Sequence, residues 1–280
     1  MTETANADQH AAWNGDSGRR WVADADRRDR VLAPIADALL DGADLRPGDR
    51  VLDVGCGCGA TSLAGARAVG PSGDVLGIDL SAPMLEVARA RADDQGATNV
   101  SFVLGDAQTH ALPPATFAVA ISRFGTMFFA DPGAAFANLA PSLQPGGRLC
   151  IATWQSLDAN DWLAIPGTVL LQYGSLPETT GPGMFSQSDP WVITTTLSAA
   201  GFTAVEVTPI AVVLNLGADP AEATGYLADT GIGRAVLDTV PEPDRPVALD
   251  AVRTALAEHQ TPRGVELGAA IWITVAVRPD

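Results

Sequence analysis

The chain has 280 residues, enough for one large α/β domain with additions or for two small domains. Hydrophobic residues make up 47% of it and charged residues 18%, which supplies a sizeable core. The formal net charge of −16 would repel a phosphate backbone, so no nucleic-acid partner is expected. No apolar stretch approaches the roughly 20 residues that cross a bilayer, so no membrane partner is expected either.

The three cysteines are Cys56, Cys58 and Cys150. They have neither CxxC spacing nor a neighbouring histidine, so no metal site is predicted. Reduced thiols are typical of a cytoplasmic protein. The opening "MTETANADQH" lacks a basic region followed by an apolar one, so no signal peptide is expected. We therefore expect a cytoplasmic protein without a metal.

Helical and strand patterns alternate through about residue 154. A helical pattern covers about residues 26–41, and a better-marked one follows Ser81, a candidate N-cap. This alternation predicts a parallel sheet with helices on both faces. The first five strands are expected in "RVLDVG" (50–55), "GDVLGIDL" (73–80), "NVSFVLGDA" (99–107), "FAVAISRF" (117–124) and "GGRLCIATW" (146–154).

The regular alternation ends after Trp154. The remaining sequence predicts one helix near 162–173, a helix at 191–202, a long strand at 205–216 and a last strand at 269–279, with these last two strands pairing at one sheet edge. The Gly- and Pro-rich stretch 180–190 is typical of a mobile cover. The expected organisation is an N-terminal helical lid (1–45), a core (46–154), a loop or cap segment (155–190), completion of the sheet (191–216 and 267–280), and a helical insert (217–266) that either covers the site or forms a homodimer contact.

The stretch "VLDVGCGCGATSL" follows the first turn signal and carries Gly55, Gly57 and Gly59. Glycines at the carboxyl end of a parallel strand let the backbone approach a ligand closely. The same residues also satisfy the loose dinucleotide pattern, with Ala60 in its last place. Asp53 favours a different ligand, because a carboxylate there would repel a pyrophosphate and attract a cation.

Two further acids end the next two strands. Asp79 closes "VLGID" and can accept hydrogen bonds from both ribose hydroxyls. Asp106 follows the third strand and is well placed to reach an adenine amino group. Three acids at successive strand ends predict one nucleoside site rather than three unrelated loop residues.

The motifs "VLDVGCGCG", "GIDLSAPML" and "GDA" resemble those of class I S-adenosylmethionine-dependent methyltransferases, and within them the ubiquinone/menaquinone-biosynthesis type. The resemblance covers roughly residues 45–154 and implies a Rossmann-like seven-stranded, mostly parallel α/β sheet with an antiparallel last strand. It also implies S-adenosyl-L-methionine as the cofactor. In this interpretation Asp53 and the glycines lie along the methionine part of the cofactor, and Asp79 holds the ribose. Leu80 and Met84 line the adenine region, and Asp106 and Ala107 hold the adenine. Cys56 and Ser122 complete the site.

An acceptor is expected over the ends of the fourth and fifth strands, where the candidates are Arg123, Phe124, Met127 and Trp154, with Trp13 from the N-terminal segment. Arg123 has three open roles: binding a substrate carboxylate, binding the cofactor carboxylate, or pairing with a local acid such as Asp131. Trp13 either closes over the cofactor or anchors the lid. No catalytic base is identified from the sequence.

The predicted function is methyl transfer to a small-molecule acceptor by in-line displacement, and the acceptor atom stays open among O, N, C and S. A nicotinamide-dependent oxidoreductase that uses the same glycines is one alternative. The others are a non-methyl-transferring S-adenosylmethionine enzyme and a binding protein without turnover.

Overall fold

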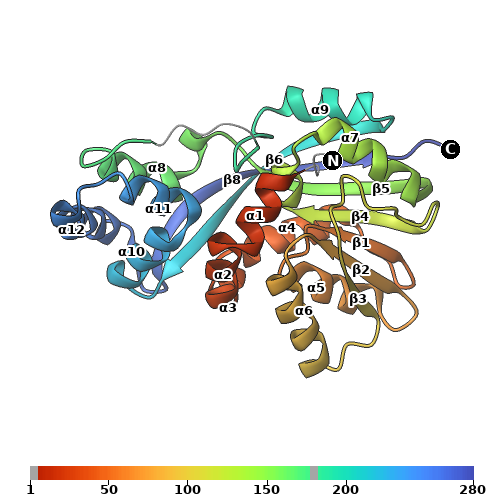
Figure 1. Cartoon of the computed structure of the whole chain (residues 1–280), viewed down its shortest axis with the longest axis horizontal. Helices are drawn as coiled ribbons and strands as arrows, with labels where there is room; N and C mark the ends of the chain where they lie inside the picture. The colour runs from red at the N-terminus through yellow and green to blue at the C-terminus, as the bar shows by residue number, and fades with distance from the viewer. Residues whose placement is uncertain (1–5, 177–181) are drawn as a thin grey trace. The chain divides into compact units, whose positions relative to one another are not determined.

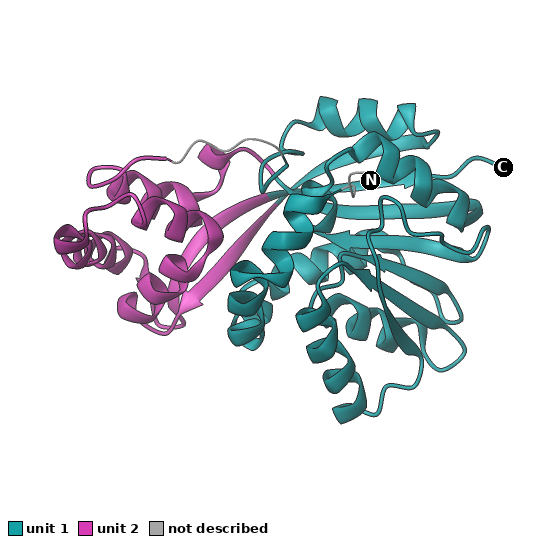
Figure 2. Cartoon of the chain, viewed as in Figure 1, with its two compact units in different colours: residues 1–154, 182–210, 271–280 teal, residues 155–181, 211–270 magenta. Residues whose placement is uncertain are grey.

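The computed structural model describes residues 6–176 and 182–280. The chain divides into two compact units (Figure 2). Unit 1 comprises residues 1–154, 182–210 and 271–280, and unit 2 comprises residues 155–181 and 211–270. The predicted mobile cover at 180–190 lies partly outside the described residues.

A sheet with the order β3-β2-β1-β4-β5-β8-β6 contains all the strands of unit 1 (Figure 1). The two-residue β7, which pairs with β8 off this path, and parts of β6 and β8 belong to unit 2. Neighbours from β3 to β5 run parallel, whereas β8 runs antiparallel to β5. This confirms the predicted Rossmann-like sheet with an antiparallel last strand. The strands are β1 (Arg50–Val54), β2 (Asp74–Asp79), β3 (Val100–Leu104), β4 (Phe117–Arg123), β5 (Leu143–Trp154), β6 (Thr203–Gly217), β7 (Gln260–Thr261) and β8 (Gly264–Val277).

The helix predicted over 26–41 is two helices, α3 (Ala25–Val31) and α4 (Ala33–Ala43). Pro34 lies in the first turn of α4, where a proline can begin a helix but has no N–H to continue one. Ser81 caps its helix as predicted, since its hydroxyl accepts from the Met84 N–H. The other helices of unit 1 are α1 (Ala7–Asn14), α2 (Asp16–Ala23), α5 (Ala60–Val69), α6 (Ala82–Asp94), α7 (Pro132–Leu139) and α9 (Pro190–Ala199).

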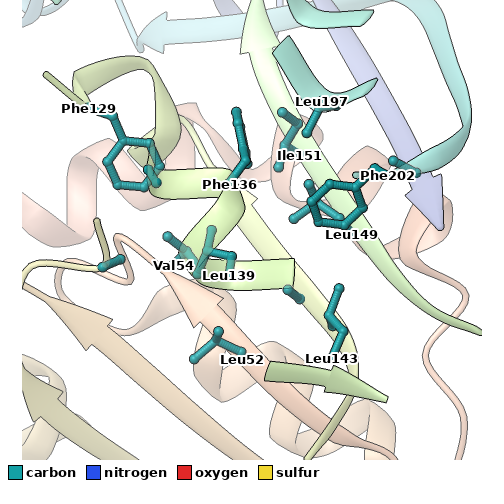
Figure 3. Close-up of a cluster of buried hydrophobic side chains, with 14 of the residues drawn as sticks. Leu52, Val54, Phe129, Phe136, Leu139, Leu143, Leu149, Ile151, Leu197 and Phe202 are labelled. Atoms are coloured by element: carbon teal, nitrogen blue, oxygen red, sulfur yellow. The ribbon is translucent and has the colours of Figure 1, made fainter. Parts of the chain in front are cut away.

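The main core of unit 1 lies between one sheet face and the helices α7 and α9 (Figure 3). Alternate residues of each strand point into it, because successive side chains of a strand face opposite sides. Leu52 and Val54 of β1 therefore join this core, whereas Asp53 faces α5. Phe136, Leu139 and Leu197 from the two helices complete the same cluster.

Unit 2 is mostly helical. Its helices are α8 (Asp161–Leu170), α10 (Pro220–Asp229), α11 (Gly231–Leu237) and α12 (Arg245–Ala257). Strand β8 begins at Gly264, earlier than the predicted 269, because residues 260–261 pair back onto it as β7. Tyr226, Val252 and Leu256 are buried in the small core of this unit. Within the described ranges, no helix has the length and apolar character needed to traverse a bilayer.

Candidate functional site

The loop between β1 and α5 requires its glycines. Gly55, Gly57 and Gly59 all have positive φ, at 69°, 53° and 82°. A Cβ on Gly55 would lie 2.7 Å from the Cα of Gly125, in the segment that follows β4. The loop therefore lies so close to that segment that only glycine, which has no Cβ, fits at this position.

Several backbone N–H groups of this loop already have protein partners. The N–H groups of Gly55 and Cys56 donate to the Ile78 carbonyl at 2.8 and 3.2 Å. Gly57 donates to the carboxylate of Asp79 at 2.8 Å, and Gly59 donates to the Cys56 carbonyl at 2.9 Å. A pyrophosphate-binding loop presents such groups to phosphate oxygens, so this arrangement disfavours the dinucleotide interpretation.

Asp53 is fully buried beside the first turn of α5. Its Oδ2 accepts from the hydroxyls of Thr61 and Ser62, both at 2.6 Å, and its Oδ1 has no hydrogen-bond partner. Burial raises the pKa of this carboxyl, and the two hydroxyls oppose that shift. A buried acceptor atom without a donor beside a glycine loop fits a ligand that carries an ammonium or sulfonium group.

Asp79 ends β2 and accepts two backbone hydrogen bonds, from Gly57 to Oδ2 and from Ser81 to Oδ1, both at 2.8 Å. Burial raises the pKa of its carboxyl to about 6, and the nearby charge of Asp53 adds to this shift. The two backbone bonds fix the orientation of the carboxylate, and each oxygen keeps further acceptor capacity for a ligand hydroxyl.

Asp106 follows β3 and meets a residue that the sequence did not indicate. The side-chain amide of Asn6 donates to both oxygens of Asp106 at 2.9 Å. The Asn6 carbonyl oxygen accepts in turn from the Ala130 N–H. An exocyclic adenine amino group is the same kind of donor as this amide, so Asn6 occupies a position that an adenine would compete for.

The N-terminal helices attach to the loop that follows β2. Asn14 donates to the Leu80 carbonyl at 2.8 Å and accepts from the Ala82 N–H at 3.0 Å. The Ser81 hydroxyl donates to the Trp13 carbonyl at 2.7 Å. Trp13 and Trp21 meet edge to face at 5.8 Å, and both pack on a cluster that contains Cys58 and Met84. These contacts tie Trp13 and its helix to the loop that follows β2.

Arg123 pairs with Asp29 of α3 at 3.0 Å, not with Asp131. Asp131 instead caps α7, where it accepts from the Ala134 N–H. Asp29 also pairs with Arg91 at 2.9 Å, and Arg91 contacts Asp26 as well. This partly buried network ties α3 to the ends of β4 and α6, and Arg123 is one of its members.

Two aromatic rings stack where the acceptor is expected. Phe124 and Trp154 lie parallel with ring centroids 4.4 Å apart. Phe124 has a φ of 71°, an uncommon conformation for a large side chain that is found at functional sites. Met127 is also buried, and the Ser122 hydroxyl donates to the Val54 carbonyl at 2.7 Å, which ties β4 to β1.

The remaining predicted residues are distributed around the same loops. Met84 and Ala107 are buried, and Leu80 is partly buried. Cys56 is a buried free thiol whose pKa burial raises well above its usual range, so it is a poor nucleophile. Sequence reasoning missed Asn6, Asn14, Asp29, Thr61 and Ser62, all of which act through contacts with distant or buried partners.

The sheet order and the antiparallel β8 define a Rossmann-like α/β fold, with Asp53, Asp79 and Asp106 at or near the carboxyl ends of β1, β2 and β3. A family model described as "Methyltransferase domain" matches residues 51–147. The chain is 34% identical over 234 residues to a nocamycin O-methyltransferase from Saccharothrix syringae, an alignment covering 78% of this chain and 81% of that protein. The chain belongs to the class I S-adenosylmethionine-dependent methyltransferases, and S-adenosylmethionine is its cofactor.

One further relative and one solved structure are similar to the chain. A ubiquinone/menaquinone biosynthesis C-methyltransferase from Cellvibrio japonicus is 38% identical over 113 residues, 40% of this chain and 45% of that protein. A solved SAM-dependent methyltransferase from Aquifex aeolicus has the same fold, with a TM-score of 0.53 and 17% identity, and the match covers 92% of this chain and 98% of that one.

Proposed function

We propose that this methyltransferase acts on a small organic molecule, with the donor nucleoside held by Asp53, Asp79 and Asp106. The observation that carries the cofactor part of the proposal is the unpartnered Oδ1 of buried Asp53 beside a loop whose N–H groups at four positions are already bonded. A relative named for O-methylation of nocamycin, aligned over most of both chains, supports a small-molecule acceptor.

S-adenosylmethionine supplies an electrophilic methyl group on a cationic sulfur. The chain would bind and orient it, with Asp53 near the positively charged part and Asp79 at the ribose. Phe124 and Trp154 offer an apolar surface that excludes water and positions an acceptor. Orientation of this kind can supply on the order of 7–11 kcal/mol of the rate enhancement.

The pH dependence of cofactor binding follows from Asp79. Its pKa of about 6 means that the free protein protonates this carboxyl as the pH falls through 6. Ribose hydroxyls donate better to the ionised form, so S-adenosylhomocysteine affinity should fall below pH 6 by up to about tenfold per pH unit. Calorimetric titrations between pH 8 and pH 5 measure this directly. Affinity that stays constant over this range would contradict the assignment.

The same group affects stability with a defined sign. Its folded pKa of about 6 exceeds the unfolded value of 3.8, so the folded state binds more protons between these values. The Asp79 contribution to the free energy of unfolding of the ligand-free protein is therefore present below about pH 4 and is lost as the pH rises to 6. Urea unfolding of the wild type and of Asp79→Asn over this range isolates the contribution, because the variant lacks it.

Asn6 should compete with the adenine. Because its amide occupies Asp106 in the free protein, Asn6→Ala should strengthen S-adenosylhomocysteine binding by about 3–5-fold, the value of roughly one net hydrogen bond. Asn14→Ala is the matched control from the same segment. It should weaken binding, because it detaches α1 from the Leu80 carbonyl. Weaker binding by Asn6→Ala would show that Asn6 stays beside the nucleoside.

The proposal is tested by parallel titration of the purified chain with S-adenosylhomocysteine and with NADH. We expect binding of the first only, at one site per chain. Incubation with methyl-labelled S-adenosylmethionine and a panel of hydroxylated, aminated and thiol-bearing organic molecules then tests transfer. Binding of NADH alone would overturn the cofactor assignment, and transfer only to protein or nucleic acid would overturn the acceptor class.

A further inference from the structure

Unit 2 contains a cavity of about 380 Å³ of its own, formed mainly by α8 and α11, with Leu227 from α10. This volume falls within the range of small-molecule sites. Three leucines that line it, Leu157, Leu171 and Leu176, are 36, 39 and 53% exposed. They make up three of the seven large hydrophobic side chains that are exposed among the described residues. Exposed apolar residues gathered at one hollow indicate a binding site rather than ordinary surface.

The cavity offers little to a polar ligand. Of the described residues that line it, Asp158 alone has a charged side chain. The Thr168 hydroxyl donates to the Ala164 carbonyl at 2.7 Å. The Thr230 hydroxyl donates to the Leu227 carbonyl at 2.7 Å and accepts from the Gly233 N–H at 3.1 Å. Both hydroxyls therefore donate to backbone carbonyls of the helices. No lysine, arginine or histidine is among the described residues that line the cavity, so a carboxylate or phosphate would find no cationic partner in this lining.

Helix α8 contains two residues that disfavour helix interiors where it borders the cavity. Pro166 and Gly167 stand side by side in the helix, although each disfavours a helix interior. A Cβ on Gly167 would meet nothing within 4 Å, so the missing side chain leaves open space beside the cavity. Local conflicts that packing does not explain are concentrated at functional sites.

We propose that this cavity binds an uncharged, mostly apolar small molecule. Four features favour that class over an ion or a strongly polar metabolite. They are the size of the cavity, the leucines at its rim, the threonine hydroxyls that already bond to the backbone, and the open space beside Gly167. The site is formed by unit 2 alone, and it is additional to the nucleoside site that Asp53 and Asp79 form in unit 1.

The test uses N-phenyl-1-naphthylamine, an uncharged fluorophore whose emission rises in apolar surroundings, with the full chain. We expect saturable binding at one site. Gly167→Leu places a side chain in the open space and should weaken dye binding by about tenfold or more. Gly225→Leu is the matched control, because Gly225 lies in α10, is exposed, also has open space around its missing Cβ and does not line the cavity.

Gly225→Leu should retain dye affinity within about twofold, and both variants should keep S-adenosylhomocysteine affinity, which shows that unit 1 is intact. Equal dye binding by Gly167→Leu and the wild type would overturn the proposal, as would absence of saturable binding. Sedimentation velocity provides the remaining test. A dimer that dissociates in Gly167→Leu would make a second copy of the chain the occupant, and would also overturn the proposal.

Discussion

Asp79→Asn should weaken S-adenosylhomocysteine binding by about 100-fold or more. Two ribose hydroxyls that donate to a carboxylate contribute about 1.5–3 kcal/mol each, and every 1.4 kcal/mol is a factor of ten. The substitution also places an amide N–H₂ against one of the two backbone donors, Gly57 or Ser81, so one 2.8 Å bond is lost. Where the lost bond is that of Gly57, the glycine loop also loses part of its support. Calorimetry on the purified variant measures the loss.

Asp74→Asn is the matched control, because Asp74 begins the same strand and its loss changes the net charge by the same amount at the opposite end of β2. Its affinity should stay within about twofold of the wild type. Thermal unfolding of both variants checks that each is folded. If folded Asp79→Asn kept wild-type affinity, the nucleoside would not lie against β2, and the assignment of the cofactor site would be wrong.

Gly55→Ala should lower the free energy of unfolding by about 2–4 kcal/mol and abolish measurable cofactor binding. The positive φ of 69° costs about 1 kcal/mol for alanine. The new Cβ would lie 2.7 Å from the Cα of Gly125, and backbone of a neighbouring strand end cannot yield as a flexible side chain does. Differential scanning calorimetry should show the transition shifted down by about 3–7 °C.

Substitutions at two other glycines separate the effect of the positive φ from the effect of steric overlap. Gly96 has a φ of 62°, and a Cβ there would have nothing within 4 Å. Gly96→Ala should therefore lower the free energy of unfolding by about 1 kcal/mol and leave cofactor binding unchanged. In Gly57→Ala the new Cβ would contact only the Met84 sulfur, at 3.6 Å. This variant should lose a similar amount of stability and should bind the cofactor more weakly. Equal stability losses in all three variants would mean that the approach of Gly55 to Gly125 is not tight.

Much of the core was predictable from local patterns. The strands β1 to β5, the cap at Ser81, and the acids near the ends of β1 and β2 follow from periodicity and turn residues that neighbouring positions determine. The last strand was placed correctly, but its start was late, because β7 is only two residues long and pairs through a turn that leaves no periodic signal.

Arg123 shows where local reasoning stops. Its place at the end of β4 follows from the apolar strand before it, but its partner, Asp29, lies 94 positions away. Asp131, the nearer candidate, instead satisfies a backbone donor of α7. The same holds for Asn6 and Asp106, which are 100 positions apart and meet only when α1 is in place.

By itself the sequence determined a parallel sheet with a glycine loop and carboxylates at the strand ends, because strand periodicity, glycine conformation and chain direction are properties of short segments. The tertiary structure alone decided which oxygen of Asp53 is left without a donor, which side chain holds Asp106, and that α8 and α11 line an apolar cavity. Those features depend on contacts between distant segments, and their energies are set by burial, which no local pattern encodes.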